Sequence, residues 1–311
     1  LDATAAPEAG RVGESSVVQG RGETSRNTLG SIANKSMSKL EPYIVTELPD
    51  RFVVLKPPGW EVFNQNVGLQ LLSFSQALCE SQWSILNDAE HNHGFLHRLD
   101  VPSSGLILAA KSFEAYYDLQ VQLRAGELCR DYVVLCHGWL PPCRREIKAH
   151  VYWRGDLPTR AGRLGKPSRT HLKVVAQASK AEQAFSLASI RIATGRRHQI
   201  RSHFSHIGHP TVCDGKYTTY ATLQGDLDFC SRNFLHRYRL VFKNAAGIDH
   251  ESLVPMPADL ADSLRQLYVK GGESAGMVRF WLSGMAPRDW EKHMPLAGQA
   301  AAIYRGRRFR S

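Results

Sequence analysis

"HGFLHRLDVPSSGLILAAK", residues 93–111, is the stretch of this sequence that constrains the fold most. Its second half is a continuous apolar run, which predicts a buried strand. A Pro-Ser-Ser-Gly turn comes directly before that strand, and Asp100 lies at the junction, two residues after Arg98. The stretch therefore predicts a carboxylate at the start of a buried strand. That carboxylate is either half of a salt bridge or a reactive group in a cleft.

Short β-rich runs and a few helical runs surround this strand. Apolar residues at helical spacing, and a glycine after two of the runs, predict the helices. Strands outnumber helices and follow one another as meanders, so the sequence predicts an α+β domain on a mixed, mostly antiparallel central sheet with flanking helices. The predicted strands lie within 43–59, 104–111, 129–140, 145–153, 169–179, 184–195 and 236–244, and the predicted helices within 69–82, 114–126, 196–208 and 258–270.

Composition excludes several classes of protein. The chain has 311 residues, of which 43% are hydrophobic, so it can bury a core. It has no run of eighteen apolar residues, so we expect no membrane partner. Its six cysteines form no CxxC pair, which argues against a zinc ribbon or a disulfide framework. A reducing intracellular compartment is expected, either mitochondrial (or otherwise organellar) or cytoplasmic.

The positive charge is concentrated in one part of the chain. Net charge is +10, and residues 144–216 hold 15 lysines and arginines against 4 acidic residues. A basic zone this local favours a polyanionic partner, with nucleic acid the first candidate. A basic surface that serves only solubility is the alternative.

Three segments are expected along the chain. Residues 1–40 lack apolar periodicity and predict a flexible arm, ordered only against a partner. The chain starts with Leu1, so we expect a fragment or a processed product. Residues 41–270 form the predicted catalytic domain. Residues 271–311 are predicted to be a basic and aromatic tail outside the catalytic core. Its basic and aromatic side chains suit contact with RNA, and its aromatic side chains could instead be buried against protein.

The stretch "TGRRHQIRSHFSHIGHP", residues 194–210, concentrates histidine and arginine in a turn and a helix. A metal site is one alternative, but His198, His203, His206 and His209 do not have the i, i+4 spacing typical of helical zinc pairs, and no acidic ligand lies nearby. A nucleophilic serine is another alternative, but "PSSG" is not a GxSxG elbow. We therefore expect no metal and no serine triad.

Taken together and in order, these motifs resemble the RluA-type family of pseudouridine synthases. The resemblance rests on four motifs: "KPPG" at 56–59, "HRLDVPSSGLILAAK" at 97–111, "RDYVVL" at 130–135 and "TGRRHQIRSHFSHIGHPTVCDGKY" at 194–217. Two positions depart from the family pattern: Ser103 replaces a threonine, and Cys213 replaces a usual glycine. The resemblance runs from about residue 43 to about residue 270.

The resemblance implies a pseudouridine synthase fold with its cleft at the centre of the sheet, and isomerisation of specific uridines in structured RNA (rRNA or tRNA) without a cofactor. Asp100 matches the catalytic aspartate, as nucleophile or as base. Arg201 matches the arginine that pairs with it, with phosphate anchoring as the alternative. Tyr132 matches the tyrosine that stacks on the target base, with core packing as the alternative. The base is expected to flip out of its stack.

RNA contacts are expected from a wider set of basic side chains. Arg196, Arg197 and His198 begin a helix after a glycine, a place suited to phosphate. The other expected RNA contacts are Lys56, His97, Arg98, Arg160 and Arg163. An alternative function is a synthase-derived structural subunit of an organellar ribosome or another large ribonucleoprotein, which binds RNA with little or no turnover.

Overall fold

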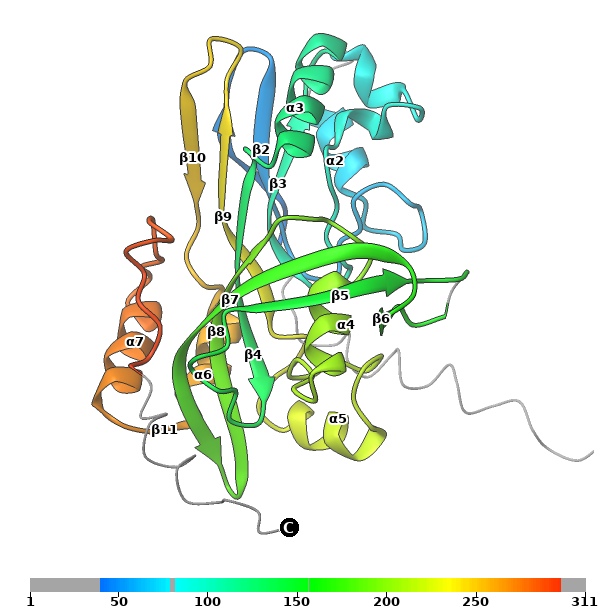
Figure 1. The fold of residues 1–311 in the computed structure, drawn as a ribbon. Coiled ribbons are helices and arrows are strands. Elements are labelled where there is room, and N and C mark those ends of the chain that lie inside the picture. Colours follow the sequence, from blue (N-terminus) through cyan, green and yellow to red (C-terminus); the bar gives the residue numbers. More distant parts are fainter. Residues whose placement is uncertain (1–39, 79–81, 156, 298–311) are drawn as a thin grey trace, which may run out of the picture. The chain divides into compact units, whose positions relative to one another are not determined.

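A computed structural model describes residues 40–78, 82–155 and 157–297 (Figure 1). Over these residues the strands join in one sheet, in the order β1-β2-β3-β9-β4-β8-β7-β5-β6, with β10 paired to β9 and β11 to β7. The strands are β1 (Tyr43–Glu47), β2 (Arg51–Lys56), β3 (Ser104–Ala110), β4 (Cys129–His137), β5 (Glu146–Tyr152), β6 (Arg160–Gly162), β7 (Lys166–Lys180), β8 (Gln183–Ile192), β9 (Leu235–Lys243), β10 (Asp249–Leu253) and β11 (Tyr268–Val269).

The sheet is mixed because one of its pairings is parallel. Strands β3 and β9 run in the same direction, whereas the other pairings are antiparallel. The α-helices around the sheet are α2 (Leu71–Leu78), α3 (Phe113–Ala125), α4 (Gln199–His206), α5 (Tyr220–Leu227), α6 (Ala258–Arg265) and α7 (Gly272–Leu282). The predicted α+β class and mostly antiparallel sheet are confirmed.

Local sequence accounts for the helix ends. Ser112 caps α3 by accepting a hydrogen bond from the backbone N–H of Ala115, and Gly126 ends that helix in the left-handed conformation, with φ of 77°. Between the predicted strands 145–153 and 169–179, the short strand β6 pairs with β5. The predicted helix 258–270 ends earlier than expected, because Tyr268 and Val269 pair with β7. Periodicity missed α5, α7 and β10.

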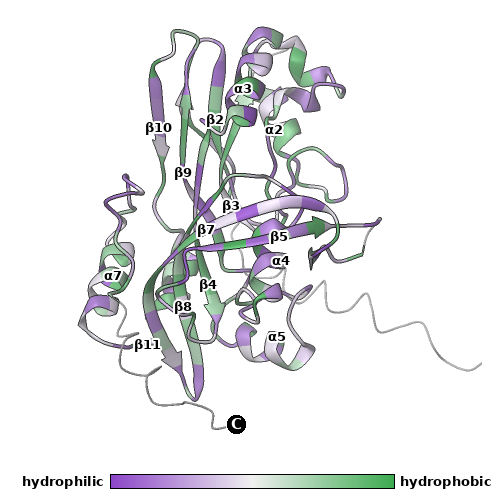
Figure 2. Cartoon of the chain, viewed as in Figure 1, coloured by the Kyte–Doolittle hydropathy of each residue, from purple (hydrophilic) through white to green (hydrophobic). Residues whose placement is uncertain are grey.

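Alternation along the strands divides the core between the faces of the sheet. On β4, Tyr132 and Val134 join a cluster with Ile200 and Phe204 of α4, whereas Val133 and Leu135 join a cluster with α6 and α7. Hydrophobic colour dominates β4 and β8 in Figure 2, as expected for strands buried on both faces. Within the described ranges no helix has both the length and the apolar character needed to cross a bilayer.

The boundary predicted at residue 270 is wrong for residues 271–297. Trp281 of α7 is only 1% exposed and packs edge-on against Tyr238 of β9, with ring centroids 5.0 Å apart. Further along, His293 Nε2 lies 2.8 Å from Ser189 Oγ, and the Leu296 N–H donates to the Val174 carbonyl. Buried apolar surface therefore makes this segment part of the catalytic domain. The predictions for residues 1–39 and 298–311 fall outside the described residues.

Candidate active site

The site lies where the turn before β3 meets α4 and the segment that follows it. A cavity of about 870 Å³ opens there. Glu61, Arg98, Asp100, Arg197, His198 and Arg201 are among the residues that line it. The structure thus brings together side chains from residues 97–102 and from 194–201, which are a hundred positions apart in the sequence.

Asp100 and Arg201 form an ion pair at this cavity. Arg201 Nη1 donates to Asp100 Oδ2 over 2.8 Å. The other edge of the same guanidinium donates to Asp214, with Nε to Oδ2 at 2.7 Å and Nη2 to Oδ1 at 2.6 Å. Two parallel hydrogen bonds fix both position and plane of an arginine. Asp214 therefore holds Arg201 in place, and Arg201 in turn holds Asp100.

Asp214 is a functional residue that sequence reasoning missed. It is 1% exposed and also accepts hydrogen bonds from Thr211 Oγ1, at 2.9 Å, and from the Lys216 N–H. These contacts satisfy its carboxylate, so Asp214 and Arg201 form a satisfied buried pair. The signal was present in "TVCDGKY", where the acid lies in the same motif as Cys213.

The charge on Asp100 depends on Arg201. Burial raises the pKa of Asp100, but the charge of Arg201, its hydrogen bond and the charge of Arg98 outweigh this effect, so the pKa is lowered from its ordinary value. His198 Nε2 lies 3.7 Å from Asp100 Oδ1. Burial lowers the pKa of His198 to about 4, so that imidazole is neutral near pH 7. Arg201 is thus the main cation that keeps Asp100 ionised.

Tyr132 is placed differently from the other predicted catalytic residues. It is 3% exposed and belongs to the core cluster with Ile190 and Ile200. Arg237 Nη2 donates to its hydroxyl oxygen, and the same guanidinium lies 4.9 Å from the centre of its ring. Tyr132 is not among the residues that line the Asp100 cavity. Stacking on the target base therefore remains a prediction.

Lys56 does not reach the surface, so its predicted RNA contact is wrong. The residue is 0% exposed, and its ammonium donates to the carbonyls of Pro57, Trp60 and Val101 at 2.8, 2.8 and 3.3 Å. An ammonium has three N–H donors, and all three are used. Lys56 instead ties the end of β2 to the turn that carries Asp100.

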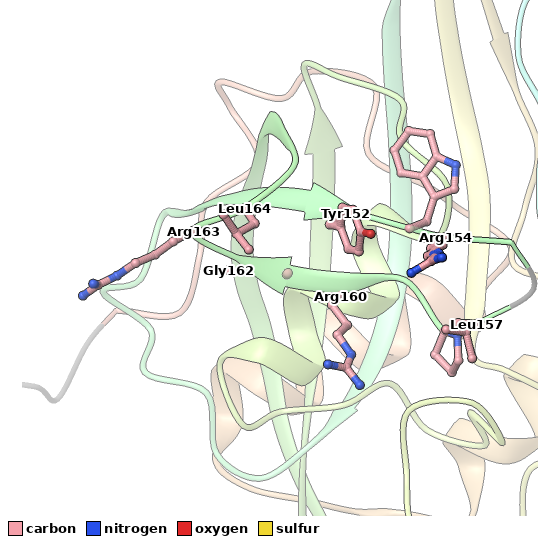
Figure 3. A pocket seen from close by; sticks show the side chains of 10 residues that line it. Tyr152, Arg154, Leu157, Arg160, Gly162, Arg163 and Leu164 are labelled. Atoms are coloured by element: carbon pink, nitrogen blue, oxygen red, sulfur yellow. The ribbon is translucent and has the colours of Figure 1, made fainter.

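The other predicted RNA contacts fall into two places. Arg98 is exposed at the Asp100 cavity, where Arg197 also lies. His97 is partly buried and accepts a hydrogen bond at Nδ1 from Arg237, and Arg196 is partly buried beside the start of α4. Arg160 and Arg163 instead line a separate hollow of about 430 Å³ along β5 and β6, where Figure 3 shows both side chains extending away from the hairpin.

The histidines of residues 194–210 do not converge on one point. His203 is buried, with Nδ1 3.0 Å from Thr170 Oγ1 and Nε2 3.2 Å from the Ala149 carbonyl, whereas His198 faces Asp100. His209 Nδ1 bonds to the His137 carbonyl. In the part of the chain that the structure describes, no three His, Cys, Asp or Glu residues are grouped to hold a metal ion.

Cys213, the departure from the family's glycine, lines the Asp100 cavity. Its φ is 55°, a left-handed conformation that glycine adopts without strain and cysteine rarely does. The buried Asp226 accepts a hydrogen bond from its backbone N–H at 2.7 Å. The loop therefore keeps a glycine-like backbone while it places a thiol beside the site.

Buried neutral histidines make stability sensitive to acid. Burial lowers the pKa of His203 to about 4, of His236 to about 3 and of His293 to about 4. Between pH 6.5 and 4 the unfolded chain therefore binds protons that the folded chain does not. We therefore expect the free energy of unfolding to decrease as the pH is lowered from 6.5 to 4, by about 1.4 kcal/mol per pH unit for each histidine.

Urea unfolding at pH 7 and pH 5 measures this loss. The variant His293→Gln, which removes one titrating group, is expected to flatten the pH slope by the share of a single histidine. Equal stability at the two pH values would show that these histidines are not held neutral.

Comparisons with known proteins point to the same family as the sequence motifs. A sequence model of the family described as RNA pseudouridylate synthase matches residues 50–206. An uncharacterized RNA pseudouridine synthase of Chloroflexus aurantiacus is 34% identical over 180 residues, which cover 56% of this chain and 53% of that protein. Ribosomal large subunit pseudouridine synthase C of Pasteurella multocida is 32% identical over 224 residues, 67% of this chain and 62% of that protein.

A solved structure extends the likeness to the fold. Human RNA Pseudouridylate Synthase Domain Containing 1 superposes with a TM-score of 0.60 at 21% identity, over 79% of this chain and 97% of that one. The chain spans between half and two thirds of the length of the two curated relatives above.

Proposed function

The chain belongs to the RNA pseudouridylate synthase family, and from that premise we propose that it converts specific uridines of structured RNA to pseudouridine with Asp100 as the reacting carboxylate. The observation that carries this proposal is the Asp214–Arg201–Asp100 chain of ion pairs at the edge of the cavity. It keeps one carboxylate ionised, oriented and open to a substrate. A subunit that only binds RNA has no need of that arrangement, so it favours turnover over the structural role.

The chemistry needs one carboxylate and no redox step. Asp100 either attacks C1′ of the ribose or removes a proton from C2′, and in both cases the N1–C1′ bond breaks with its electron pair on the base. The detached uracil rotates and C5 bonds to C1′, while Asp100 either leaves C1′ or returns its proton to C2′. The proton on C5 then leaves and N1 takes up a proton, so that Asp100 is regenerated. The cavity of about 870 Å³ is large enough to hold a flipped nucleotide away from bulk water.

The proposed substrate is ribosomal RNA of the large subunit, with tRNA as the second choice. The name of the Pasteurella multocida relative supports the first. The basic zone of residues 144–216 supports a polyanion in general. The proposal includes a ribosome or another ribonucleoprotein as the partner. It also includes a reducing compartment, mitochondrial (or otherwise organellar) or cytoplasmic, for which the cysteine pattern is the support.

Release of tritium from RNA labelled at C5 of uridine tests this function, because the C5 hydrogen is lost only when C5 bonds to ribose. Transcripts of large-subunit rRNA segments and of tRNAs are incubated with the protein under the same conditions. Release from a subset of the rRNA segments is expected. No release from any transcript, with RNA binding intact, would favour the structural role.

Arg160 and Arg163 are expected to supply affinity and not chemistry. The double variant Arg160→Ala, Arg163→Ala should weaken RNA binding and reduce the slope of log K against log salt by about 0.7 for each lost phosphate contact. The rate at saturating RNA should not change. The control Arg265→Ala removes an exposed arginine from α6. An unchanged slope in the double variant would place the RNA path away from the β5–β6 hairpin.

A further inference from the structure

Three buried basic residues follow a path across the sheet from β2 to Tyr132 of β4. Lys56 pairs with Gly105 across β2 and β3, Gly105 pairs with Arg237 across β3 and β9, and Arg237 pairs with Tyr132 across β9 and β4. Directly opposite residues share a face. Arg130 lies two residues before Tyr132 on β4, and its charge interacts with Tyr132 and Arg237. We call Lys56, Arg130 and Arg237 the cation row.

Gly105 lets the backbone of Arg237 approach within the row. A Cβ at Gly105 would lie 2.3 Å from the Arg237 carbonyl oxygen and 2.7 Å from its Cβ, and φ at Gly105 is 130°. No other residue fits there, so the close packing of β3 against β9 depends on glycine. This is the glycine of the Ser-Ser-Gly turn in residues 93–111.

The members of the cation row have neutral partners. Lys56, Arg130 and Arg237 are 0%, 3% and 2% exposed. Arg237 Nη1 donates to the Leu106 carbonyl at 2.8 Å and to His97 Nδ1 at 2.7 Å, and Nη2 donates to the Tyr132 hydroxyl. Arg130 reaches the Ile192 and Ala193 carbonyls at 3.5 and 3.4 Å. The Nε atoms of Arg130 and Arg237 have no hydrogen-bond partner within the described ranges.

Elsewhere in this fold, buried arginines are paired with carboxylates. Arg51 contacts Asp50 and Asp118, Arg201 contacts Asp214, and Arg232 contacts Asp259. In the part of the chain that the structure describes, no member of the cation row has such a partner. Burying an unpaired charge costs several kcal/mol. The row is therefore a destabilising arrangement, and such arrangements concentrate at functional sites.

The Lys56 end of the row lies close to the reactive carboxylate, because its ammonium donates over 3.3 Å to the carbonyl of Val101, the residue after Asp100. Burial lowers the pKa of Lys56 well below its ordinary value, and the charges of Arg232 and Arg237 act in the same direction, while those of Asp100 and Glu61 act in the opposite one. Burial also lowers the pKa of Arg130, to about 10. Asp100 already has Arg201 as its partner. Arg130 and Arg237 thus provide positive charge that no carboxylate contacts in the described part of the chain.

We propose that the cation row is the counter-charge for the uracil anion formed during the reaction, an inference that rests on the proposed function. When the N1–C1′ bond breaks, its electron pair passes to the base, and negative charge spreads over N1, O2 and O4 while Asp100 bonds to C1′ or takes the C2′ proton. The uridine is neutral before this step. A fixed positive potential therefore stabilises the transition state more than bound substrate, which is the condition for a faster rate.

Arg237 is the positioning residue of the row. It fixes the hydroxyl of Tyr132 and the ring of His97, and it carries the charge that lies over the face of Tyr132. It acts on the base through that charge and through Tyr132, since neither side chain lines the cavity.

The variant Arg237→Met tests the proposal because it removes the charge but keeps an unbranched side chain. We expect kcat to fall by about 10²–10³-fold, as for loss of one fixed donor to a developing anion, with KM for RNA unchanged. The temperature of thermal unfolding should stay the same or rise, because an unpaired buried charge has been replaced by an apolar group. Arg237→Lys, which keeps the charge, should recover part of kcat.

Arg239→Met is the matched control on the same strand. Arg239 contacts Asp131 and Glu251, so its loss should lower the unfolding temperature and leave kcat unchanged. If Arg237→Met behaves like Arg239→Met, or lowers kcat and unfolding temperature together, Arg237 is structural and the proposal is wrong. An unchanged or higher kcat would also overturn the proposal, because Arg237 would then only pack against Tyr132 and would not contribute to the rate.

A binding measurement separates this proposal from the proposed function. The probe is 5-nitrouracil, whose ring is anionic at neutral pH, and uracil is the neutral control. A ligand that binds only the folded state raises the unfolding temperature. We expect 5-nitrouracil, and not uracil, to stabilise the wild-type protein and the Arg239→Met variant, and to lose this effect in Arg237→Met. Equal stabilisation of the two variants would contradict the cation row even if the RNA is isomerised.

Discussion

Replacement of Asp100 by asparagine is expected to reduce pseudouridine formation by about 10⁴-fold or more, the usual scale for loss of a reacting side chain. The amide keeps the shape of the carboxylate but can neither attack C1′ nor accept the C2′ proton. Arg201 still donates two hydrogen bonds to Asp214, so the fold around the cavity should persist. Tritium release at saturating RNA measures the rate, and filter binding measures affinity.

RNA affinity of Asp100→Asn should remain within about threefold of wild type, because the phosphate-binding surface is intact. Asp262→Asn, which changes an exposed carboxylate on α6, is the control and should leave both quantities unchanged. Residual turnover within about tenfold of wild type would show that Asp100 is only a partner for Arg201.

Replacement of Trp281 by alanine is expected to lower the free energy of unfolding by about 3–5 kcal/mol, the usual range for a buried tryptophan. Trp281 is 1% exposed, and no smaller side chain can fill the space between α7 and β9. Such a loss is a large part of the stability of a typical domain. Truncation after residue 270 removes all of α7 and should prevent folding.

Urea unfolding followed by tryptophan fluorescence and by circular dichroism measures the effect. Met285→Ala is the control, because Met285 is 53% exposed and its loss leaves no cavity. A folded and active 41–270 fragment would restore the domain boundary that the sequence predicted and would make α7 an addition to the core.

Several predictions from the sequence were confirmed because they depend on local signals. Alternation and apolar runs located the central strands, and Gly126 marked the end of α3. The Asp100–Arg201 contact, between residues a hundred positions apart, came instead from the resemblance to the RluA-type family. Residues 271–297 were assigned to a tail because α7 has no clear apolar periodicity, and its burial depends on packing against β9.

The burial of charged groups could not be predicted from the sequence. Lys56 was expected at the RNA because of its motif, yet it is 0% exposed at the end of β2, where it pairs with Gly105 of β3. Arg237 itself lies in an ordinary strand pattern that gives no sign of its partners. Which side chains meet across a sheet depends on the register of strands far apart in the chain, and one-residue differences in register reverse the outcome.

Mapping of pseudouridine at single-nucleotide resolution, after carbodiimide treatment and primer extension, tests the central role of Asp100 most directly. Large-subunit rRNA that lacks the modification is incubated with the wild-type protein, with Asp100→Asn or with Asp262→Asn. We expect the wild type and Asp262→Asn to modify the same small set of uridines and Asp100→Asn to modify none of them. Pseudouridine at those positions with Asp100→Asn, or at no position with the wild type, would contradict catalysis by the carboxylate that Arg201 holds at this cavity.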